Sequence, residues 1–341
     1  MGAINVKHTG SGAAIALSSD GTSLLLDGIA VGGGGGADLY AANESSPTAQ
    51  PSATGANAVA IGEAAVASGV DSIAIGTGAE AFGERGLALG NYSHSRVSGY
   101  SSTAIQIQRA STSYGALGSY DFAVGNSAKT TNSYAGVFAG SANISSGRGS
   151  VCIGGDQNEA SGWYSIASGY LSTASGIASY ASGMQSVSNI DGKKAHASWR
   201  FANDGDAQTG LFSLHKATTD ATPAPLLTGW TATPGTTNQV VLPNNSVYGF
   251  TGTIIARENS AQTNDFAVWE VKGGAVRATG VATTALGSYN INKISESTGA
   301  AAWAIGISAD TTNGAIAFTV TGEASHSIRW VATINTTEVT Y

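Results

Sequence analysis

The sequence predicts an all-β protein built from three successive segments. These are an N-terminal anchor with its linker (1–50), a repetitive parallel β-roll (51–190) and an antiparallel β-sandwich (191–341), which we call the anchor, the shaft and the tip. Glycine makes up 47 of the 341 residues and recurs every seven residues through the middle of the chain. Only 11% of residues are charged, against about 25% in an ordinary soluble domain. Five of the six tryptophans follow residue 195, among strand-like runs without a credible helix.

The anchor combines short strand-forming runs with a flexible linker. Strands are expected at 13–17 and 23–31, around the turn Ser19-Asp20-Gly21. Residues 32–36 are five consecutive glycines, and prolines 47 and 51 extend the linker. No Gly-Lys-Ser/Thr follows the glycines and no helical pattern opens after them, so a phosphate-binding loop is not expected.

The shaft shows a repeat of about 14 residues made of two half-repeats. Glycine occurs at every seventh residue at positions 55, 62, 69, 76, 83 and 90. The seven-residue spacing returns at 118–125, 140–154 and 155–183. Alternate glycines follow bulky-small-bulky triplets such as Val59-Ala60-Ile61, and the others follow small residues such as Thr173-Ala174-Ser175. Each repeat is therefore expected to be one coil of two short strands with a glycine corner after each.

Strand alternation sets the faces of each coil. Val59 and Ile61 point one way and Ala60 the other. Each corner glycine is expected to supply either a positive φ or a close backbone approach. Eight or nine coils are expected between residues 55 and 188. Such a coil is too thin to bury its own strands, so the alanine face is expected to pack against neighbouring copies in a homotrimer. Residues 100–114 contain a glycine-free stretch, which predicts a distorted coil there.

The tip begins after a polar neck at 189–194 and has longer strands. They are expected at 208–218, 248–257, 266–271, 302–308, 315–321 and 328–334, with turns at 234–235, 243–245, 272–274 and 312–314. Trp199, Trp269 and Trp330 fall inside strand patterns and are expected in the core. Trp230 lies between two prolines, and Tyr289 follows Gly287-Ser288, so both are expected on loops.

Composition narrows the classes of partner. The formal net charge is −7 and no basic stripe is present, which argues against nucleic acid. The first residues lack a signal-peptide pattern, and the apolar runs are far shorter than the ~20 residues of a membrane-spanning helix. We therefore expect synthesis in a cytoplasm and no membrane insertion.

Candidate catalytic groups are few, and none is expected to act. The five histidines show no metal-binding spacing, so neither a metal nor a cofactor is predicted. Cys152 occupies the slot of Ala60 in its repeat and is expected to pack there. Asp204 and Asp206 read as a turn and not as a catalytic carboxylate pair. The remaining carboxylates considered for the tip are Glu258, Asp265 and Glu270.

The repeats resemble a known family of surface proteins. Asn57-Ala58-Val59-Ala60-Ile61-Gly62 and Asp71-Ser72-Ile73-Ala74-Ile75-Gly76 look like the head repeats of YadA-type trimeric adhesins. Gly90-Asn91-Tyr92-Ser93-His94 and Ala160-Ser161-Gly162-Trp163-Tyr164 resemble the related repeats of bacteriophage tail fibres. The resemblance covers about residues 51–188 and implies a trimer of left-handed parallel β-rolls.

The tip resembles the C-terminal domains of phage and prophage tail-fibre proteins. The likeness is carried by Trp199-Arg200-Phe201-Ala202-Asn203-Asp204-Gly205, Asn238-Gln239-Val240-Val241-Leu242-Pro243 and Ile328-Arg329-Trp330-Val331-Ala332-Thr333. It implies a non-enzymatic, receptor-binding fibre in the virion tail of a tailed bacteriophage, made in the cytoplasm of the bacterial host. Its N-terminus would join other tail proteins, and its C-terminus would bind a host surface glycan multivalently.

Aromatic and amide side chains on tip loops are the candidate glycan ligands, because sugar rings stack on aromatic faces and amides bond to hydroxyls. The candidate receptor-binding residues are Trp230, Asn244, Asn245, Tyr289, Asn290 and Asn313. Three alternatives stay open: a polysaccharide-depolymerising tail spike, a head-fibre or baseplate component without host contact, and a bacterial trimeric autotransporter. The last would need a signal peptide and a membrane anchor.

Overall fold

A computed structural model confirms the all-β class. It describes residues 4–7, 14–19, 24–26, 29–31, 49–95, 100–108, 113–229, 231, 233–259 and 264–341. Within these ranges there is no α-helix, and the helical content is two short 3-10 turns, η1 (Val281–Thr283) and η2 (Thr298–Ala300). The part of the chain that the structure describes also contains no helix able to span a membrane.

The chain divides into two compact units, residues 1–45 and 46–341. The first unit holds one antiparallel sheet in the order of the chain, formed by β1 (Ile4–Lys7), β2 (Ala14–Ser19), β3 (Leu24–Leu26) and β4 (Ile29–Val31). The strand expected at 23–31 is in fact a hairpin, with Leu26 opposite Ile29. The glycines at 32–36 lie outside the described residues.

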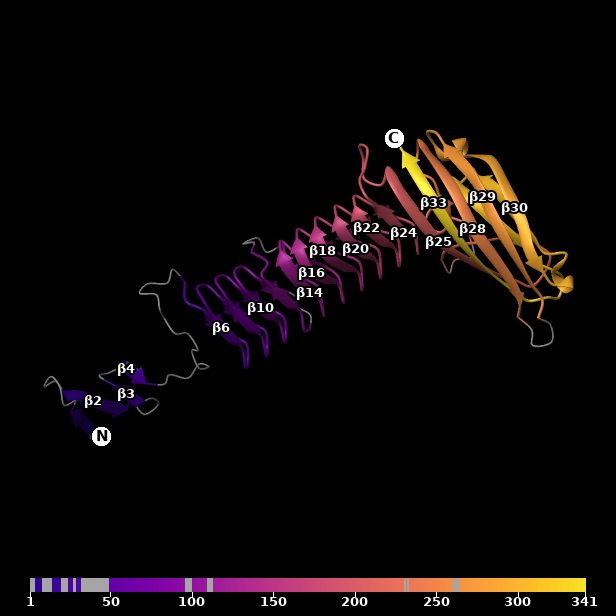
Figure 1. Cartoon of the computed structure of the whole chain (residues 1–341). Helices are drawn as coiled ribbons and strands as arrows, with labels where there is room; N and C mark the ends of the chain where they lie inside the picture. Colours follow the sequence, from indigo (N-terminus) through magenta and orange to yellow (C-terminus); the bar gives the residue numbers. More distant parts are fainter. Residues whose placement is uncertain are drawn as a thin grey trace. The chain divides into compact units, whose positions relative to one another are not determined.

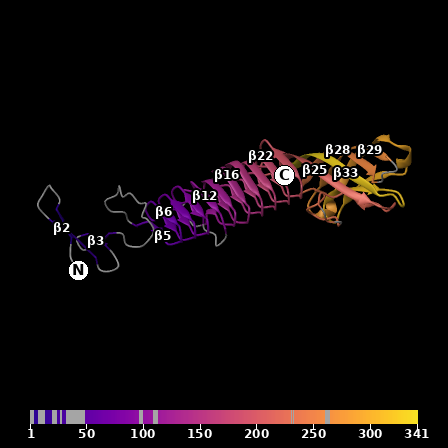
Figure 2. The same ribbon diagram turned by 90° about the horizontal axis from the view of Figure 1, so that it is seen from below.

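The second unit begins with a parallel β-roll whose coils stack strand upon strand (Figures 1 and 2). Each coil adds one strand to each of two sheets. The first sheet receives β6 (Val59–Ile61), β8 (Ile73–Ile75), β10 (Leu87–Leu89), β12 (Thr103–Ile105), β14 (Phe122–Asn126), β16 (Gly136–Ser141), β18 (Val151–Asp156), β20 (Ile166–Tyr170), β22 (Tyr180–Met184) and β24 (Lys194–Ala197).

The second sheet of the roll also has ten strands. It contains β5 (Ser52–Ala53), β7 (Val66–Ala67), β9 (Glu80–Ala81), β11 (His94–Ser95), β13 (Gly115–Ala116), β15 (Lys129–Thr130), β17 (Ile144–Ser145), β19 (Glu159–Ala160), β21 (Thr173–Ala174) and β23 (Val187–Ser188). The roll thus has about ten coils, slightly more than the eight or nine expected.

Coil length follows the sequence repeat except where the repeat was expected to fail. Ile73 pairs with Leu87, which lies 14 residues later. Thr103 lies 16 residues after its partner Leu87, and Phe122 lies 19 residues after Thr103. The distorted coil predicted around 100–114 is therefore confirmed, and the strands on both sides of it keep their pairing.

The two glycine corners satisfy two different demands. At one corner, Gly76 has φ +126°, and a Cβ there would lie 2.6 Å from the carbonyl carbon of Gly90 in the next coil. At the other corner, Gly69 has no positive φ, but a Cβ would lie 2.0 Å from the carbonyl oxygen of Gly83. Both reasons given for the repeat, a left-handed backbone and a close backbone approach, are thus realised.

The alanine face lies inside each coil, which corrects the expectation that it would meet neighbouring copies. Ala74 and Ala88 are fully buried, and Cys152 fills the equivalent slot. The coil interior is narrow, so most side chains between its two sheets are small, and Val137 is among the larger ones. Bulky neighbours point outward instead, and Ile75 is 38% exposed and Ile153 52% exposed. The face available to another copy is therefore the bulky one.

The roll runs into the tip without a break in its hydrogen bonding (Figure 1). Residues 189–194, expected as a neck, close the last coil and lead into β24, which pairs with β22 on one side and antiparallel with β25 on the other. The larger tip sheet therefore extends the first roll sheet to 15 strands. Its tip strands are β25 (Ala207–Thr218), β33 (Ile328–Thr340), β28 (Ser246–Glu258), β29 (Phe266–Arg277) and β30 (Ala285–Glu296).

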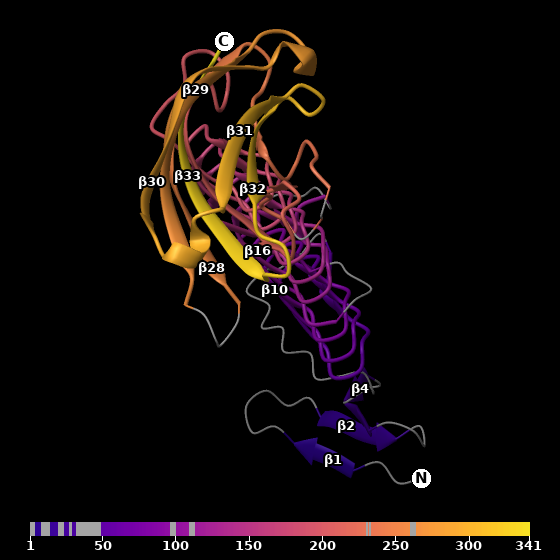
Figure 3. The same cartoon turned by 90° about the vertical axis from the view of Figure 1, so that its right-hand side faces the viewer.

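A smaller sheet faces the larger one and closes a sandwich (Figure 3). It contains β26 (Ala224–Pro225), β27 (Val240–Val241), β31 (Ala304–Asp310) and β32 (Ala315–Thr321). Trp269 and Trp330 lie in the core between the sheets, with ring centroids 5.6 Å apart, as expected for both. Trp199 was expected in the core as well, but it lies outside any strand and is 58% exposed.

Two local expectations for the tip are wrong. Lys272-Gly273-Gly274 is not a turn but the middle of β29, where Gly273 lets Phe250 and Tyr289 pack closely against its backbone. Tyr289 and Asn290 do not lie on a loop but in β30. That strand forms an edge of the sheet with almost no buried side chain, so its sequence carries little of the alternation that marks a half-buried strand.

Candidate binding groove

Two rows of outward side chains cross the 15-stranded sheet at right angles to its strands. Strand pairing places one residue of each strand in the first row and one residue of each strand except β30 in the second. The first row reads Val59, Ile73, Leu87, Thr103, Phe122, Gly136, Val151, Ile166, Tyr180, Lys194, Leu211, Asn335, Thr251, Lys272 and Asn290. The second reads Ile61, Ile75, Leu89, Ile105, Val124, Phe138, Ile153, Ser168, Ser182, His196, Thr209, Thr337, Gly249 and Gly274.

The chemistry of the rows changes where the shaft meets the tip. In the shaft the rows are dominated by isoleucine, leucine, valine and phenylalanine. From Ser168 and Tyr180 onward they contain hydroxyl, amide and cationic side chains with a single leucine. We call the first part the apolar stripe and the second the polar stripe.

The polar stripe forms the floor of a groove with a volume of about 930 Å³. Its walls and floor come from β22 and β24 of the roll and from all five long strands of the tip sheet, including Ser182, Lys194, Thr251, Lys272 and Asn290. Neighbouring strands lie about 4.8 Å apart, so the four strand steps from Lys194 to Lys272 span about 19 Å. A groove of this length suits an extended ligand better than a single small molecule.

The groove is electropositive within an acidic chain. Lys194 and Lys272 are exposed, and neither forms an ion pair with a residue that the structure describes. His196 lies on the same strand as Lys194, with its Nδ1 atom 3.1 Å from the Ser182 hydroxyl. The described lining contains no aspartate or glutamate. Such a local positive field attracts negative groups despite the net charge of −7.

A preorganised loop carries two exposed aromatic side chains beside the groove. Trp199 and Phe201, 58% and 78% exposed, line a hollow of about 440 Å³ that shares His196 with the groove. The Asp206 carboxylate accepts the backbone N–H groups of 201, 202 and 203 at 2.7–2.8 Å. Burial acts to raise the pKa of Asp206, but these hydrogen bonds and Arg200 hold it below its usual value. The loop is therefore fixed before any ligand arrives.

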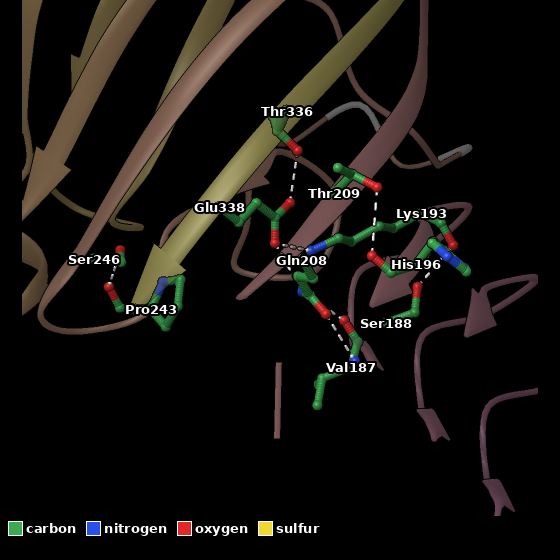
Figure 4. Close-up of polar contacts among 10 residues, drawn as sticks. All are labelled: Val187, Ser188, Lys193, His196, Gln208, Thr209, Pro243, Ser246, Thr336 and Glu338. Carbon is green, nitrogen blue, oxygen red and sulfur yellow. Dashed lines mark hydrogen bonds and ion pairs between the residues drawn. The ribbon is translucent and has the colours of Figure 1, made fainter. Parts of the chain in front are cut away.

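A buried ion pair fastens the last coil of the roll to the last strand of the tip (Figure 4). Lys193 Nζ donates to Glu338 Oε2 at 2.7 Å, and both side chains are almost fully buried. Gln208 Nε2 also donates to Glu338 Oε2, and the Thr336 hydroxyl donates to Oε1. Burial, followed by the Glu338 charge, raises the pKa of Tyr248 well above its ordinary value. This network lies on the inner side of the sheet whose outer side forms the groove.

The structure does not gather the six predicted receptor-binding residues into one site. Tyr289 and Asn290 line the groove. Asn244 lies in a separate hollow of about 360 Å³ and accepts the Gly280 N–H. Asn245 occupies a left-handed turn position, and Trp230 lies outside the described residues.

Asn313 is engaged within its own turn. Its backbone N–H and its Nδ2 atom both donate to Asp310. Burial acts to raise the pKa of Asp310, but the hydrogen bonds from Asn313 and Gln239 lower it below its usual value. The predicted receptor role of all six residues remains a prediction.

The remaining candidate groups have structural partners. Asp204 pairs with Arg200 at 2.6 Å, and Asp206 closes the loop described above, as the turn interpretation predicts. Burial raises the pKa of the Cys152 thiol to about 12, so it stays protonated. In the described part of the chain no three histidine, cysteine or acidic side chains are grouped as a metal site would require.

Sequence reasoning missed most of the groove, including Lys194, His196, Thr251 and Lys272. The available signal was the alternation of buried and exposed positions in the long tip strands, which marks Thr251 and Lys272 as outward residues. Strand order and register decide which outward residues share a row. Neither can be read from the sequence here, because the strands of this antiparallel sheet follow the order β25-β33-β28-β29.

Comparison with known proteins places the shaft in a recognised repeat type. The family model of the YadA head domain repeat matches residues 53–79, 67–93 and 167–188. These segments span well under half of the chain and lie entirely within the roll. In these segments the shaft is similar to the YadA head domain repeat.

Solved structures similar to the chain include two phage proteins. One is a tailspike protein from Acinetobacter baumannii bacteriophage Fri1, a capsular polysaccharide depolymerase, with a TM-score of 0.26 and 8% identity. The other is the tailspike protein of Acinetobacter baumannii phage AM24, with a TM-score of 0.23 and 9% identity. Each comparison covers 82% of this chain and 50% of the other, so the chain spans about half the length of these proteins. No curated protein matches the chain.

Proposed function

We propose that the protein is a receptor-binding fibre of a tailed bacteriophage that attaches to a host surface glycan through the groove at the junction of shaft and tip. The observation that carries the proposal is the change of one sheet face from apolar to polar at that junction. The apolar stripe serves self-association, and the polar stripe serves attachment.

The exposed apolar stripe supports self-association. Ile73, Ile75, Phe138 and Ile153 are between 37% and 52% exposed in a single chain, and they lie on strands β8, β16 and β18 of the same sheet face. Exposed apolar surface of this extent is typical of an interface. Three copies joined along the stripe would form the homotrimer that the repeats imply, and three grooves on one rigid body would raise avidity without strong single contacts.

The groove suits a saccharide because its floor presents many hydrogen-bonding groups on a rigid sheet. Thr209, Thr251, Asn335 and Asn290 supply hydroxyl and amide groups that can both donate and accept. Tyr180 at one end of the row offers an aromatic ring, and its hydroxyl lies 3.3 Å from that of Ser168. Because these groups stand on paired strands, little ordering is required on binding.

A blocking substitution tests the proposal directly. Thr251→Trp places a large side chain in the middle of the groove, and Thr253→Trp places the same side chain two residues away on the same exposed face, outside the groove. We expect the full chain to bind immobilised bacterial surface polysaccharides, Thr251→Trp to lose at least about tenfold in affinity and Thr253→Trp to bind normally. Equal binding by all three proteins would contradict the proposal.

A second pair of variants separates the groove from the irregular coil of the shaft. Tyr180→Ala removes the aromatic ring of the groove and should weaken binding by about 1–3 kcal/mol. Tyr100→Ala removes a ring that is 52% exposed next to the irregular coil and should leave binding unchanged. The reverse result would place the receptor site in the shaft.

Attachment without cleavage is favoured over depolymerisation by the make-up of the groove. Glycoside hydrolysis needs two carboxyl groups about 5–9 Å apart, and the described lining of the groove has none. Incubation of the full chain with a polysaccharide that it binds should therefore yield no shorter oligosaccharides. Release of such fragments would establish the depolymerase alternative.

We further propose that residues 1–31 join the fibre to other virion tail proteins. This segment forms its own small sheet, within a compact unit distinct from residues 46–341. Deleting residues 1–31 should leave a chain that still binds polysaccharide but is not incorporated into phage particles. Normal incorporation would contradict this role and would favour another mode of attachment to the particle.

A further inference from the structure

We infer that the ligand of the groove is an acidic polysaccharide whose repeated negative charges pair with Lys194 and Lys272. This inference rests on the proposed function and names the class of glycan. It comes from the placement of charge along the polar stripe.

The two lysines are the distinctive feature of the polar stripe. Both occupy the first row, on β24 and β29, and both are exposed. Two other lysines near the tip are already paired: Lys193 with Glu338 and Lys293 with Glu296. Lys194 and Lys272 form no ion pair with a described residue, and the described lining supplies no acidic side chain to neutralise them.

No acidic side chain in the described lining of the groove offsets the charge of the two lysines. Glu270 lies two residues from Lys272 on the same strand, but it does not line the groove. In a chain with 15 basic and 22 acidic residues, two unpaired lysines in a groove free of acids concentrate the positive field where a ligand would lie. A neutral glycan would leave both ammonium groups without a partner.

The spacing of the lysines indicates a polymer with repeated charges. They stand four strands apart, about 19 Å along the sheet, with hydroxyl and amide groups between them. One carboxylate or phosphate cannot reach both ends. A chain of sugars with acidic groups at intervals can meet both lysines while its neutral hydroxyls bond to Asn335 and Thr251.

A nucleic acid is also a polyanion but fits the groove less well. Its phosphates recur at every nucleotide, which calls for many basic contacts, whereas this groove offers two lysines and one histidine and no arginine. The overall charge of −7 also opposes a dense polyanion. Competition by single-stranded DNA is therefore an outcome that would contradict the inference.

The test uses the full chain and a panel of immobilised microbial polysaccharides, some neutral and some bearing uronate or phosphate groups. Every uronate polymer is measured beside its carboxyl-reduced form, which keeps the sugar chain and removes the charge. Lys194→Met and Lys272→Met are compared with Lys129→Met, which removes the same charge from the shaft outside the groove.

We expect binding to acidic members of the panel, about tenfold weaker for Lys194→Met and for Lys272→Met and unchanged for Lys129→Met. Carboxyl reduction should cause a comparable loss for a uronate polymer, and loss only with phosphate polymers would identify phosphate as the anionic group. Raising NaCl from about 0.05 M to about 0.5 M should weaken binding of the unmodified chain.

Three results would overturn the inference: binding to neutral polysaccharides alone, full affinity of both lysine variants, or displacement by single-stranded DNA at equal concentration. In each of the first two cases, sensitivity to Thr251→Trp would still uphold the groove as the attachment site. Binding to no polysaccharide, or binding that ignores Thr251→Trp, would instead contradict the proposed function itself.

Discussion

The shaft and the tip share one sheet, but the two rows of outward side chains are apolar in the shaft and mostly polar in the tip. In the shaft the outward positions are bulky and apolar, as at Ile75 and Ile153, and the inward positions are alanine. In the tip the two rows are mostly polar, as at Thr251 and Lys272, while apolar outward side chains such as Val331 lie beyond the rows. The inward positions hold large side chains such as Phe212 and Trp330. The difference follows from what covers the inner side of each part of the sheet.

A thin roll and a sandwich place their apolar surface on opposite sides. The interior of a coil holds mainly alanine and other small side chains, so the roll buries little apolar area within one chain and exposes most of its bulky side chains. The tip has a second sheet that covers its large side chains, so its outer face is free to be polar. A single chain therefore leaves the bulky side chains of the shaft exposed, whereas the tip buries its largest side chains between two sheets.

The largest expected effect comes from the corner glycines of the shaft. Gly76→Val combines a side chain at φ +126° with a Cβ that would overlap Gly90, and it should cost about 4–6 kcal/mol. Gly249→Val in the tip meets open space without a positive φ, and its stability should stay within about 1 kcal/mol of the unmodified chain. Thermal unfolding measures both. Similar stability of the two variants would remove the distinction between shaft and tip glycines.

The junction between the two regions should be nearly as sensitive. Lys193→Met leaves Glu338 buried without its cation and should destabilise the chain by about 3–5 kcal/mol. Adding Glu338→Gln should restore much of this loss, because the buried charge is then gone. A double-mutant cycle by denaturant unfolding gives the coupling, and additive losses would show that the two side chains do not act as a pair.

The apolar stripe should govern association without governing the fold of the single chain. Ile75→Asp adds a charge at a position 38% exposed in one chain, so its coil can form, but three such charges would meet at the proposed contact between copies. Sedimentation should show at least about a tenfold weaker association. Thr253→Asp on the outer face of the tip serves as the control and should associate normally. A stable assembly of the Ile75→Asp chain would mean that copies meet elsewhere.

The smallest expected effect is the pH dependence that one carboxyl group of the shaft contributes. Burial raises the pKa of Asp121 to about 6, against hydrogen bonds from Thr130, Ala135 and Gly118. The native state then binds more protons than the unfolded state between about pH 4 and pH 6. Protonation of Asp121 therefore makes the shaft more stable as the pH falls from 7 to 5.

Comparing the unmodified chain with Asp121→Asn isolates the contribution of the Asp121 carboxyl group. When the pH is lowered from 7 to 5, the Tm of the unmodified chain should change more favourably than the Tm of the variant, by a few degrees. The same pH dependence in both proteins would show that Asp121 is not the group responsible.

The shaft could be predicted from the sequence because its structure is local. Each coil pairs with the next, so the spacing of Gly69 and Gly76 fixes strand order and register at once. The direction of the faces could not be settled that way, since alternation shows that Ala74 and Ile75 point apart but not which of them is inside. The tip depends on pairings across a hundred residues, such as Lys194 with Leu211 and then Asn335, so the groove that they build is not visible in the sequence.

The most direct test of the account is a cryo-electron microscopy structure of the full chain in its solution assembly. The account predicts three copies, with three times the 33.9 kDa mass of one chain, joined along the apolar stripe with Ile75 and Ile153 buried between them. Lys194 and Lys272 should remain open to solvent in each copy. A map in which the apolar stripe faces solvent, or in which another copy covers the groove, would contradict it.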